Sequence, residues 1–455
     1  MAKQNSPLVL GTERIGKLLT QYAIPAIIAM TASSLYNMAD SIFIGHGVGP
    51  LAISGLALTF PLMNLAAAFG SLVGVGASTL VSVKLGQKDY DGANKVLGNV
   101  LVLNVLLGLA FTFAFLFMLD PILYFFGASE HTIAYARDYM EIILYGNVIT
   151  HMYLGLNAVL RSSGFPKLAM YATLASVVIN CVLNPIFIFG FDWGIKGSAW
   201  ATIISQVISL TGQFIHFSRP TQLLHFKKGI YKLRKEIVKG ILYIGMSPFL
   251  MNLCSCLIVI LINRGLKEHG GDMAIGAYGI INRLLTLYVM IVLGLTMGMQ
   301  PIVGYNFGAQ KIDRVKQTLR LGIISGVVIT SSGFIICEFF PHAVSALFTD
   351  SDELIDLAVD GIRLAVLMFP FVGAQIVIGN FFQSIGKAKI SIFLSLTRQL
   401  LYLLPCLLLF PNWWGLEGIW ISMPVSDALA FITAVVSLMI YIKKVSKQHP
   451  ETVAE

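Results

Sequence analysis

Long apolar runs without a charged residue recur along the whole sequence, and they limit the possible folds more than any other feature. A helix needs about 20 largely apolar residues to cross the hydrocarbon core of a bilayer. Eight charge-free runs of this size are present, and four shorter or once-interrupted runs lie between them. Only 12% of the 455 residues are charged, against about 25% in a soluble domain. This excludes a disordered chain, a nucleic-acid-binding protein and a soluble two-domain enzyme, so we expect an all-α integral membrane protein.

The apolar runs predict twelve transmembrane helices. We expect them at residues 18–45, 51–80, 95–119, 137–160, 168–190, 195–217, 237–264, 273–301, 317–340, 357–382, 389–411 and 414–442. The ninth range has a short apolar run, and the eleventh and twelfth each contain a charged residue. These three ranges have the least distinctive hydropathy.

The basic residues of the loops lie mostly on one side of the membrane. With an even number of helices both termini share a side, and 24 of the 31 Lys and Arg residues fall on that side. Five lie on the opposite side, and Arg283 and Arg398 fall within the expected helices. Because cytoplasmic loops carry the excess of Lys and Arg, we expect both the N- and the C-terminus in the cytoplasm. The net charge of +8 thus indicates orientation rather than an acidic partner.

The two halves of the sequence resemble each other at a shift of about 222 residues. The clearest match pairs Trp193-Gly194-Ile-Lys-Gly197 with Trp414-Gly415-Leu-Glu-Gly418. Weaker matches at nearly the same shift join Gly49 to Gly271, Gly86 to Gly308 and Gly164 to Gly386. Six helices per half keep one orientation, as in secondary transporters with two lobes related by a pseudo-two-fold axis along the membrane normal. We expect two six-helix lobes, 1–218 and 240–455, joined by a basic cytoplasmic linker at 219–239.

The sequence lacks the residue patterns of an enzyme. The eight histidines have no HExxH-type spacing, and no phosphate-binding loop of the GxxxxGK[ST] type is present. The five cysteines lie inside apolar runs, and Cys254-Ser-Cys256 has the wrong spacing for a structural zinc site. We therefore expect no enzymatic activity, no cofactor and an energy source other than ATP.

Asp40 is the most informative polar residue within an expected span, because a charge there is costly and marks a functional site by default. Counted from the outer ends of their helices at about 1.5 Å per residue, Asp40, Asn184 and Thr202 come to a similar depth. Asn180 lies one turn deeper, on the same face as Asn184. Carboxylate, amide and hydroxyl oxygens can bind a small cation or tune a proton-accepting carboxylate. We expect these four residues to form a coupling site for H⁺ or Na⁺.

Two interpretations of the intramembrane polar residues stay open. Asn180, Asn184 and Thr202, taken singly, can simply join helices through hydrogen bonds. Arg283, Arg398 and Asp427 in the C-terminal half can form structural ion pairs or line a cavity of that lobe. At the position equivalent to Asp40 the second half has Asn263, so only the N-terminal half has an acid there.

Three segments in combination resemble the MATE (multidrug and toxic compound extrusion) family. They are Ile24-Pro25 through Asp40-Ser-Ile-Phe-Ile-Gly45, Asn180 to Asn184-Pro185 with Trp-Gly-Ile-Lys-Gly after it, and Gln300-Pro301-x-x-Gly304-Tyr-Asn-Phe-Gly308-Ala. The resemblance covers about residues 15–445. It implies a twelve-helix, two-lobe antiporter that exports amphiphilic, often cationic compounds in exchange for Na⁺ or H⁺. In prokaryotic members an Asp with Asn or Asp and Thr partners forms the coupling site, and these roles carry over to Asp40, Asn180, Asn184 and Thr202.

The sequence departs from the pattern of the family at two places. Some members have a second Asp at the position of Asn184, so the site in this chain has one charge fewer. Other members have an acid in helix 7 or helix 10, whereas residues 240–263 and 364–386 contain none. Because of this second difference, we expect Asp40 to be the acid that binds the coupling ion.

The residues near Asp40 predict part of a substrate path. Ser33, Tyr36 and Asn37 precede Asp40 by seven, four and three residues and share its helix face. Further expected substrate contacts are Met30, Tyr139, Asn157 and Gln206. Pro25 is the expected bending point of the first helix during alternating access.

We expect a small organic substrate, a lipid bilayer environment, no nucleic-acid partner and a monomer in the plasma (inner) membrane of a bacterium. One alternative is a flippase for lipid-linked saccharides, which would need several cationic residues in its central cavity. The other is a membrane receptor or scaffold without transport activity. The intramembrane acid and the repeat argue against this last class.

Overall fold

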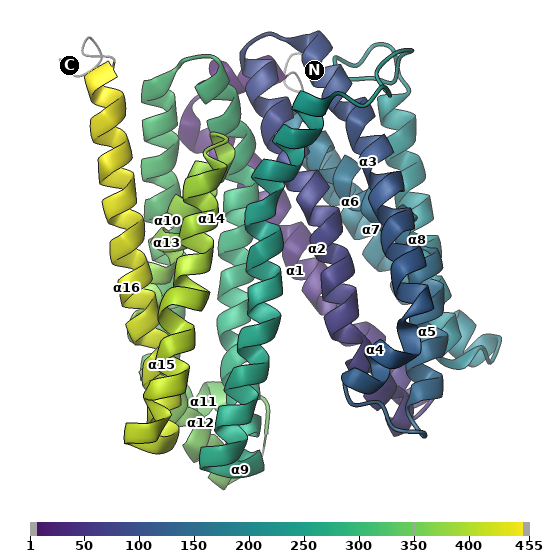
Figure 1. Ribbon diagram of the computed structural model, residues 1–455, viewed down its shortest axis with the longest axis vertical. Coiled ribbons are helices and arrows are strands. Elements are labelled where there is room, and N and C mark those ends of the chain that lie inside the picture. Colours follow the sequence, from purple (N-terminus) through teal and green to yellow (C-terminus); the bar gives the residue numbers. More distant parts are fainter. Residues whose placement is uncertain (1–6, 350, 449–455) are drawn as a thin grey trace. The chain divides into compact units, whose positions relative to one another are not determined.

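The computed structural model describes residues 7–349 and 351–448, which form helices and, within these ranges, no β-strand (Figure 1). A short 3₁₀ turn, Pro7–Gly11, precedes the first helix. The helices of the first half are α1 (Ile15–Gly47), α2 (Pro50–Gly86), α3 (Tyr90–Phe117), α4 (Leu119–Phe125), α5 (Ile133–Tyr145), α6 (Asn147–Ser162), α7 (Pro166–Pro185) and α8 (Gly194–Phe217). Those of the second half are α9 (Lys235–Gly308), α10 (Ile312–Phe339), α11 (Pro341–Ser345), α12 (Asp352–Ala365), α13 (Phe369–Ser384), α14 (Ala388–Leu396), α15 (Leu404–Leu409) and α16 (Pro411–Gln448).

The helices account for the predicted membrane spans. Nine helical segments of the described residues are long and apolar enough to cross a membrane by themselves, with α9 divided at Gly271. Two further spans are the pairs α5 with α6 and α12 with α13, each bent by 55°. The remaining long helix, α8, is less apolar, but its 24 residues give a length of about 36 Å. The prediction of twelve transmembrane helices is confirmed, and the fourth and tenth spans are bent pairs.

The internal repeat is visible in the backbone angles. Gly194 and Gly415, at the clearest sequence match, have φ values of 55° and 56°. Three other pairs at a shift of 222 residues, Gly49 with Gly271, Lys88 with Gln310 and Gly164 with Gly386, have φ values between 59° and 117°. Positive φ is uncommon in proteins and marks defined turns. The two halves therefore use the same turns at the same places.

The contacts within the chain divide it into two compact units. Unit 1 comprises Ile28–Phe249 with the segment before Arg14 and with Gly308–Gln310. Unit 2 comprises Arg14–Ile27, Leu250–Phe307 and the chain from Lys311 onwards. This division differs from the expected lobes, since the first half of α1 belongs to unit 2 and the first part of α9 belongs to unit 1. The lobe and linker limits expected from the sequence stay a prediction.

Glycines allow the helices of each unit to approach closely. A Cβ atom on Gly245 of α9 would lie 1.8 Å from the carbonyl oxygen of Leu72 in α2, within unit 1. A Cβ atom on Gly298 would lie 2.5 Å from Cα of Ala23, within unit 2. Small residues permit such backbone contact between membrane helices, where packing rather than the hydrophobic effect drives association.

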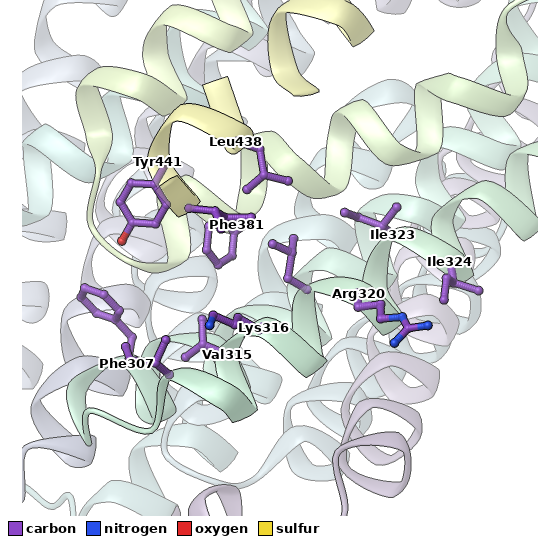
Figure 2. Close-up of a pocket in the computed structure, with 12 residues that line it drawn as sticks. Phe307, Val315, Lys316, Arg320, Ile323, Ile324, Phe381, Leu438 and Tyr441 are labelled. Carbon is purple, nitrogen blue, oxygen red and sulfur yellow. The ribbon is translucent and has the colours of Figure 1, made fainter. Parts of the chain in front are cut away.

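A groove lies on unit 2 between the end of α9, α10, α13 and α16 (Figure 2). Its volume is about 350 Å³. The walls are apolar apart from Lys316 and Arg320 on α10 and Tyr441 on α16. The groove thus combines an apolar surface with two cationic side chains.

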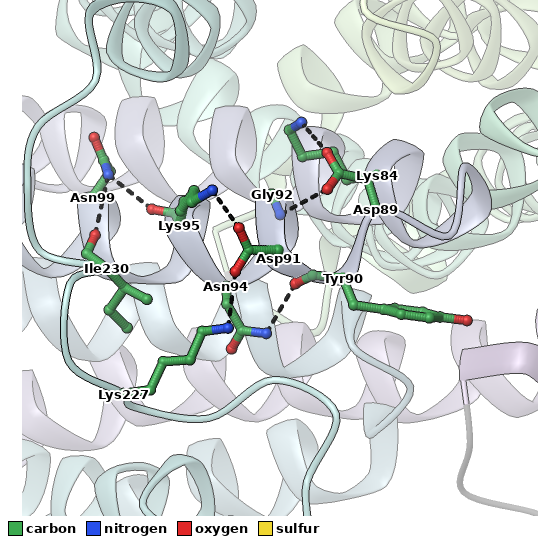
Figure 3. Close-up of polar contacts among 10 residues, drawn as sticks. All are labelled: Lys84, Asp89, Tyr90, Asp91, Gly92, Asn94, Lys95, Asn99, Lys227 and Ile230. Atoms are coloured by element: carbon green, nitrogen blue, oxygen red, sulfur yellow. Dashed lines mark hydrogen bonds and ion pairs between the residues drawn. The ribbon is translucent and has the colours of Figure 1, made fainter.

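The basic segment between α8 and α9 is attached to α3 (Figure 3). Asn94 Oδ1 accepts a hydrogen bond from the backbone N–H of His225 at 3.0 Å. Asn99 Oδ1 likewise accepts from the N–H of Arg234 at 3.0 Å. The Nδ2 atom of each asparagine donates to carbonyl oxygens of the same segment. The expected linker is therefore held against unit 1 over much of its length.

Charged residues close the turn between α2 and α3 (Figure 3). Asp89 caps α3 by accepting from the N–H of Gly92 at 2.8 Å, and it forms an ion pair with Lys84 at 2.7 Å. The hydrogen bond from Lys84 lowers the pKa of Asp89 below its ordinary value. Lys227 of the linker forms an ion pair with Asp91 at 2.9 Å. These pairs join the turn and the linker at one end of unit 1.

Candidate functional site

The four residues expected at a coupling site lie together in unit 1. Asn184 Nδ2 donates to Asp40 Oδ1 at 2.9 Å and to Asn180 Oδ1 at 2.7 Å. Asn180 Nδ2 donates in turn to Thr202 Oγ1 at 3.1 Å. All four residues are buried, with at most 7% of their surface exposed. A continuous chain of hydrogen bonds therefore connects α1, α7 and α8.

The end of α7 places both asparagines. Asn180 and Asn184 are one turn apart, and residues four apart share a helix face. Pro185 ends the regular helix, and the wider π turn Ile186–Gly190 follows it. Proline lacks a backbone N–H to donate within a helix, and π turns are frequent at functional sites. The local sequence thus places both amides on one face, where Asn184 contacts the carboxylate and Asn180 contacts Asn184.

Ser198 of α8 is a member of this site that the sequence analysis missed. Its hydroxyl donates to Asp40 Oδ1, the same oxygen that accepts from Asn184. Ser198 is fully buried. It lies one turn before Thr202 on α8, and this four-residue spacing from a predicted site residue is the feature of the sequence that could have identified Ser198. Two donors on one carboxylate oxygen stabilise its negative charge.

Tyr36, expected on the substrate path, lies within the same network. Its hydroxyl is 2.8 Å from Thr202 Oγ1 and accepts from Asn180 Nδ2 at 3.3 Å. Tyr139, another expected substrate contact, is fully buried. Its hydroxyl has no hydrogen-bond partner among the described residues. Of these two tyrosines, Tyr36 is therefore the one that is hydrogen-bonded to the polar network within the described part of the chain.

The Oδ1 atom of Asn184 is buried and has no hydrogen-bond partner among the described residues. A buried acceptor without a partner is costly, by about 1–3 kcal/mol. The described residues contain no group of three or more His, Cys, Asp or Glu side chains that could hold a metal ion. A cation at this site would instead be bound by the carboxylate of Asp40 with amide and hydroxyl oxygens. The site can therefore take a proton or a small cation.

The other residues of the expected substrate path form no hydrogen bond with this network in the part of the chain that is described. Asn157 Nδ2 donates to the carbonyl oxygen of Ala169 at 2.9 Å and so joins α6 to α7. Gln206 Oε1 accepts from Thr150 Oγ1 at 2.6 Å and joins α8 to α6. The remaining three are Met30 and Ser33, which are half-buried on α1, and Asn37, whose side chain lies outside the described residues. Their contact with substrate stays a prediction.

Polar side chains continue from the site along the buried face of α8. Thr202, Ser205, Ser209 and Gln213 follow one another at three- or four-residue spacing, and all are buried. The Ser209 hydroxyl and both amide atoms of Gln213 have no hydrogen-bond partner among the described residues. Buried polar groups are usually satisfied by protein or by ordered water. This face of α8 is therefore suited to holding water.

Arg398 and Asp427 form an ion pair in unit 2, with 2.7 Å between Nε and Oδ1. The Asp427 side chain is 7% exposed and the Arg398 side chain is 33% exposed. Arg283 is exposed and forms no ion pair within the described ranges. The ion-pair interpretation thus fits Arg398 and Asp427, and the structure does not bring Arg283 into it.

Comparisons with known proteins identify the family. The sequence model of the MatE family matches residues 25–186 and 244–408. The multidrug export protein MepA of Staphylococcus aureus strain MSSA476 is 28% identical over 430 residues, 94% of this chain and 93% of that protein. MepA of Staphylococcus haemolyticus strain JCSC1435 is 29% identical over 419 residues, 92% of each chain. A solved outward-facing conformation of a multidrug resistance MATE family transporter of the MOP superfamily has a TM-score of 0.89 at 25% identity, covering 96% of this chain and 98% of that one.

The matched ranges span most of both halves of the chain and contain Asp40, Asn180 and Asn184. The likeness to the solved transporter extends over nearly the whole of both chains. The motifs noted in the sequence fall inside the same ranges, apart from the Trp-Gly segments. The chain belongs to the MatE family, the multidrug and toxic compound extrusion (MATE) transporters.

Proposed function

We propose that this protein is a secondary active antiporter that exports amphiphilic, cationic drugs or toxic metabolites in exchange for H⁺. The observation that carries the proposal is the buried carboxylate of Asp40, which accepts hydrogen bonds from Asn184 and Ser198. The multidrug export relatives support the class of substrate. Membership in a transporter family supports the expectation that the chain is not an enzyme.

The donors around Asp40 favour a proton over Na⁺ as the coupling ion. Two donors point at Asp40 Oδ1, and the Asn180 oxygen already accepts from Asn184. This leaves Asn184 Oδ1 as an amide oxygen without a partner. A small hard cation takes several oxygen ligands at once, whereas a proton needs a single acceptor. Binding of Na⁺ would require the Asn184 amide to turn. The experiment below distinguishes Na⁺ from H⁺ as the coupling ion.

Protonation of Asp40 would change the charge of a buried group, and this change is the basis of coupling. A charge within the membrane interior is stable only with suitable partners, whereas a neutral carboxyl group depends on them less. The ionised form favours the state that binds a cationic substrate, and the protonated form favours its release. A ligand shifts a conformational equilibrium only through such a difference in affinity.

Pro25 is supported as the bending point of α1. Proline removes one hydrogen bond from the helix interior and promotes kinks. The division between the two units falls between Ile27 and Ile28, close to this proline. The two parts of α1 therefore belong to different units, and a bend between them is the expected conformational step.

We place the protein in the plasma (inner) membrane of a bacterium with both termini in the cytoplasm, because 24 of its 31 basic residues lie on the side of the termini. The flippase alternative has less support. It requires several cationic residues in one cavity, and of the two arginines within the expected spans the charge of Arg398 is neutralised by Asp427, which leaves Arg283.

The test is transport by the full chain reconstituted in proteoliposomes. A fluorescent organic cation is followed while a pH gradient and a Na⁺ gradient are imposed separately. We expect the pH gradient to drive transport in the wild type. The Asp40→Asn variant should reach the membrane and bind substrate, but it should not transport against a gradient.

Asp138→Asn is the matched control, since Asp138 is an exposed acid of unit 1 that pairs with Lys196 at 3.3 Å. It should transport like the wild type. Transport driven by Na⁺ alone would show that the coupling ion is wrong. Wild-type transport by Asp40→Asn would show that the coupling site is wrong.

A further inference from the structure

The groove on unit 2 is separate from the network around Asp40, and its shape suits an elongated apolar group (Figure 2). Leu319 of α10, Phe381 of α13 and Leu438 of α16 contribute to its walls, around a volume of about 350 Å³. In Figure 2, Phe381 and Leu438 lie on one side of the space, and Val315 and Lys316 of α10 lie on the other. The transport proposal gives this groove no role.

The length of the groove matches one leaflet of a bilayer. Its α10 wall runs from Ile312 to Ile324, which is about 18 Å at 1.5 Å per residue. The hydrocarbon core is about 30 Å thick, so one leaflet contributes about 15 Å. Ile324 is 49% exposed, which indicates that the groove is open to its surroundings. An acyl chain entering from the membrane would therefore fit along this wall.

Two cationic side chains lie along the α10 wall of the groove, between Ile312 and Ile324. Lys316 and Arg320 are one turn apart, close to the start of α10. Neither forms an ion pair with a carboxylate within residues 7–349 and 351–448. Tyr441 lies near the end of α16, and tyrosine is enriched at the level of lipid headgroups. Both charges lie within the first three turns of α10, which begins at the surface that we expect to be cytoplasmic, and this part of the groove is suited to an anionic group.

We propose that this groove binds one anionic phospholipid of the adjacent leaflet. Its phosphate lies between Lys316 and Arg320, and one acyl chain lies along the apolar wall. Lysine and arginine form charge-assisted hydrogen bonds with phosphate oxygens, and the cytoplasmic leaflet is rich in anionic lipids. The two positive charges also exclude a cationic transport substrate from this groove. The site is therefore a lipid site, distinct from any site for the exported compound.

The test is lipid binding to the purified full chain by native mass spectrometry. The detergent-solubilised protein is titrated with phosphatidylglycerol and, in a parallel series, with zwitterionic phosphatidylcholine of the same acyl chains. We expect one phosphatidylglycerol to be retained in preference to phosphatidylcholine. The double variant Lys316→Gln/Arg320→Gln should weaken binding of this first lipid about tenfold or more, because charged hydrogen bonds are lost.

Two further variants distinguish specific lipid binding in the groove from nonspecific attraction of anionic lipid to basic residues on the protein surface. Lys443→Gln/Lys444→Gln removes two exposed charges from the end of α16, outside the groove lining, and should leave the first lipid bound. Ile323→Trp keeps the charges but fills the groove, and it should release that lipid. An equal loss of affinity in the Lys443 and Lys444 variant would overturn the proposal. So would unchanged binding in folded Ile323→Trp protein, or equal retention of the two lipids by the wild type.

Discussion

Neutralising Arg398 should destabilise the protein more than neutralising Asp427, although both changes break the same ion pair. Arg398→Gln leaves the Asp427 carboxylate, with 7% of its side chain exposed, without its cation. Asp427→Asn leaves an arginine that is 33% exposed and can turn toward a more polar environment. The cost of breaking the pair therefore depends on which charge remains behind.

The burial of the two partners sets the expected magnitudes. Leaving a buried charge without its partner costs about 3–5 kcal/mol, and we expect about 3 kcal/mol for Arg398→Gln because its partner is nearly fully buried. Asp427→Asn leaves the more exposed partner behind, so we expect a smaller cost of about 1 kcal/mol, the upper end of what exposed pairs contribute. The double variant leaves no unpaired charge, so its unfolding free energy should lie within about 1 kcal/mol of the wild type.

Thermal unfolding of the purified full chain in detergent, followed by tryptophan fluorescence, measures these differences. An unfolding entropy of about 2.1 cal/mol/K per residue gives, for 455 residues, a shift of about 1 °C per kcal/mol. The midpoint should therefore fall by roughly 3 °C for Arg398→Gln and by roughly 1 °C for Asp427→Asn. Arg283→Gln is the control, since Arg283 is exposed and such changes stay within about 0.5 kcal/mol. Equal shifts for the two single variants would refute the argument from burial, and so would a double variant as unstable as Arg398→Gln.

Three other predictions test the site, the packing and the turn at α3. Ser198→Ala removes one of two donors to Asp40. It should lower stability by about 1.5–3 kcal/mol and reduce pH-driven transport in proteoliposomes, and wild-type values of both would remove this serine from the site. Gly245→Val would place a Cβ atom 1.8 Å from a backbone oxygen of α2, so little folded protein should be found in membrane fractions. Gly212→Ala, with nothing within 4 Å of its Cβ, should express normally. Asp89→Ala should cost about 1 kcal/mol near neutral pH through loss of the helix cap. The pKa of Asp89 is lowered in the folded state, so the stability difference between the wild type and Asp89→Ala should shrink as the pH falls through the folded-state pKa. Thermal unfolding that shows the same stability difference at every pH would contradict this prediction.

The helices were predictable because apolar length is the direct requirement for crossing a bilayer. Where the structure contains features that the sequence did not predict, single residues cause them. The bend after α5 falls at Gly146, which looks like an ordinary glycine in an apolar run. The attachment of the linker depends on Asn94 and Asn99, whose partners lie more than 100 residues further along the chain. Hydropathy contains no information about such distant partners.

Counting residues along helices of known rise predicted a similar depth for Asp40, Asn184 and Thr202, and the resemblance to the MATE family indicated that they share one site with Asn180. Ser198 was missed because a serine in a membrane helix is common and signals nothing until its neighbour is known. The hydrogen bonds of other expected substrate contacts join helices instead. Which face of a helix packs on a neighbour depends on tertiary contacts, and one sequence does not specify these.

The attachment of the linker to α3 has a consequence for biosynthesis. Asn99 is fully buried, and its partner Arg234 follows it by 135 residues. At about 5–20 residues per second, the ribosome reaches Arg234 roughly 7–27 s after Asn99. During this interval the newly inserted helices contain an amide whose final partner has not been synthesised. A nascent chain stopped at residue 218 would lack this partner, whereas one extended through residue 234 would contain it. The segment between the halves thus supplies the partners that Asn94 and Asn99 of α3 lack until it has been synthesised.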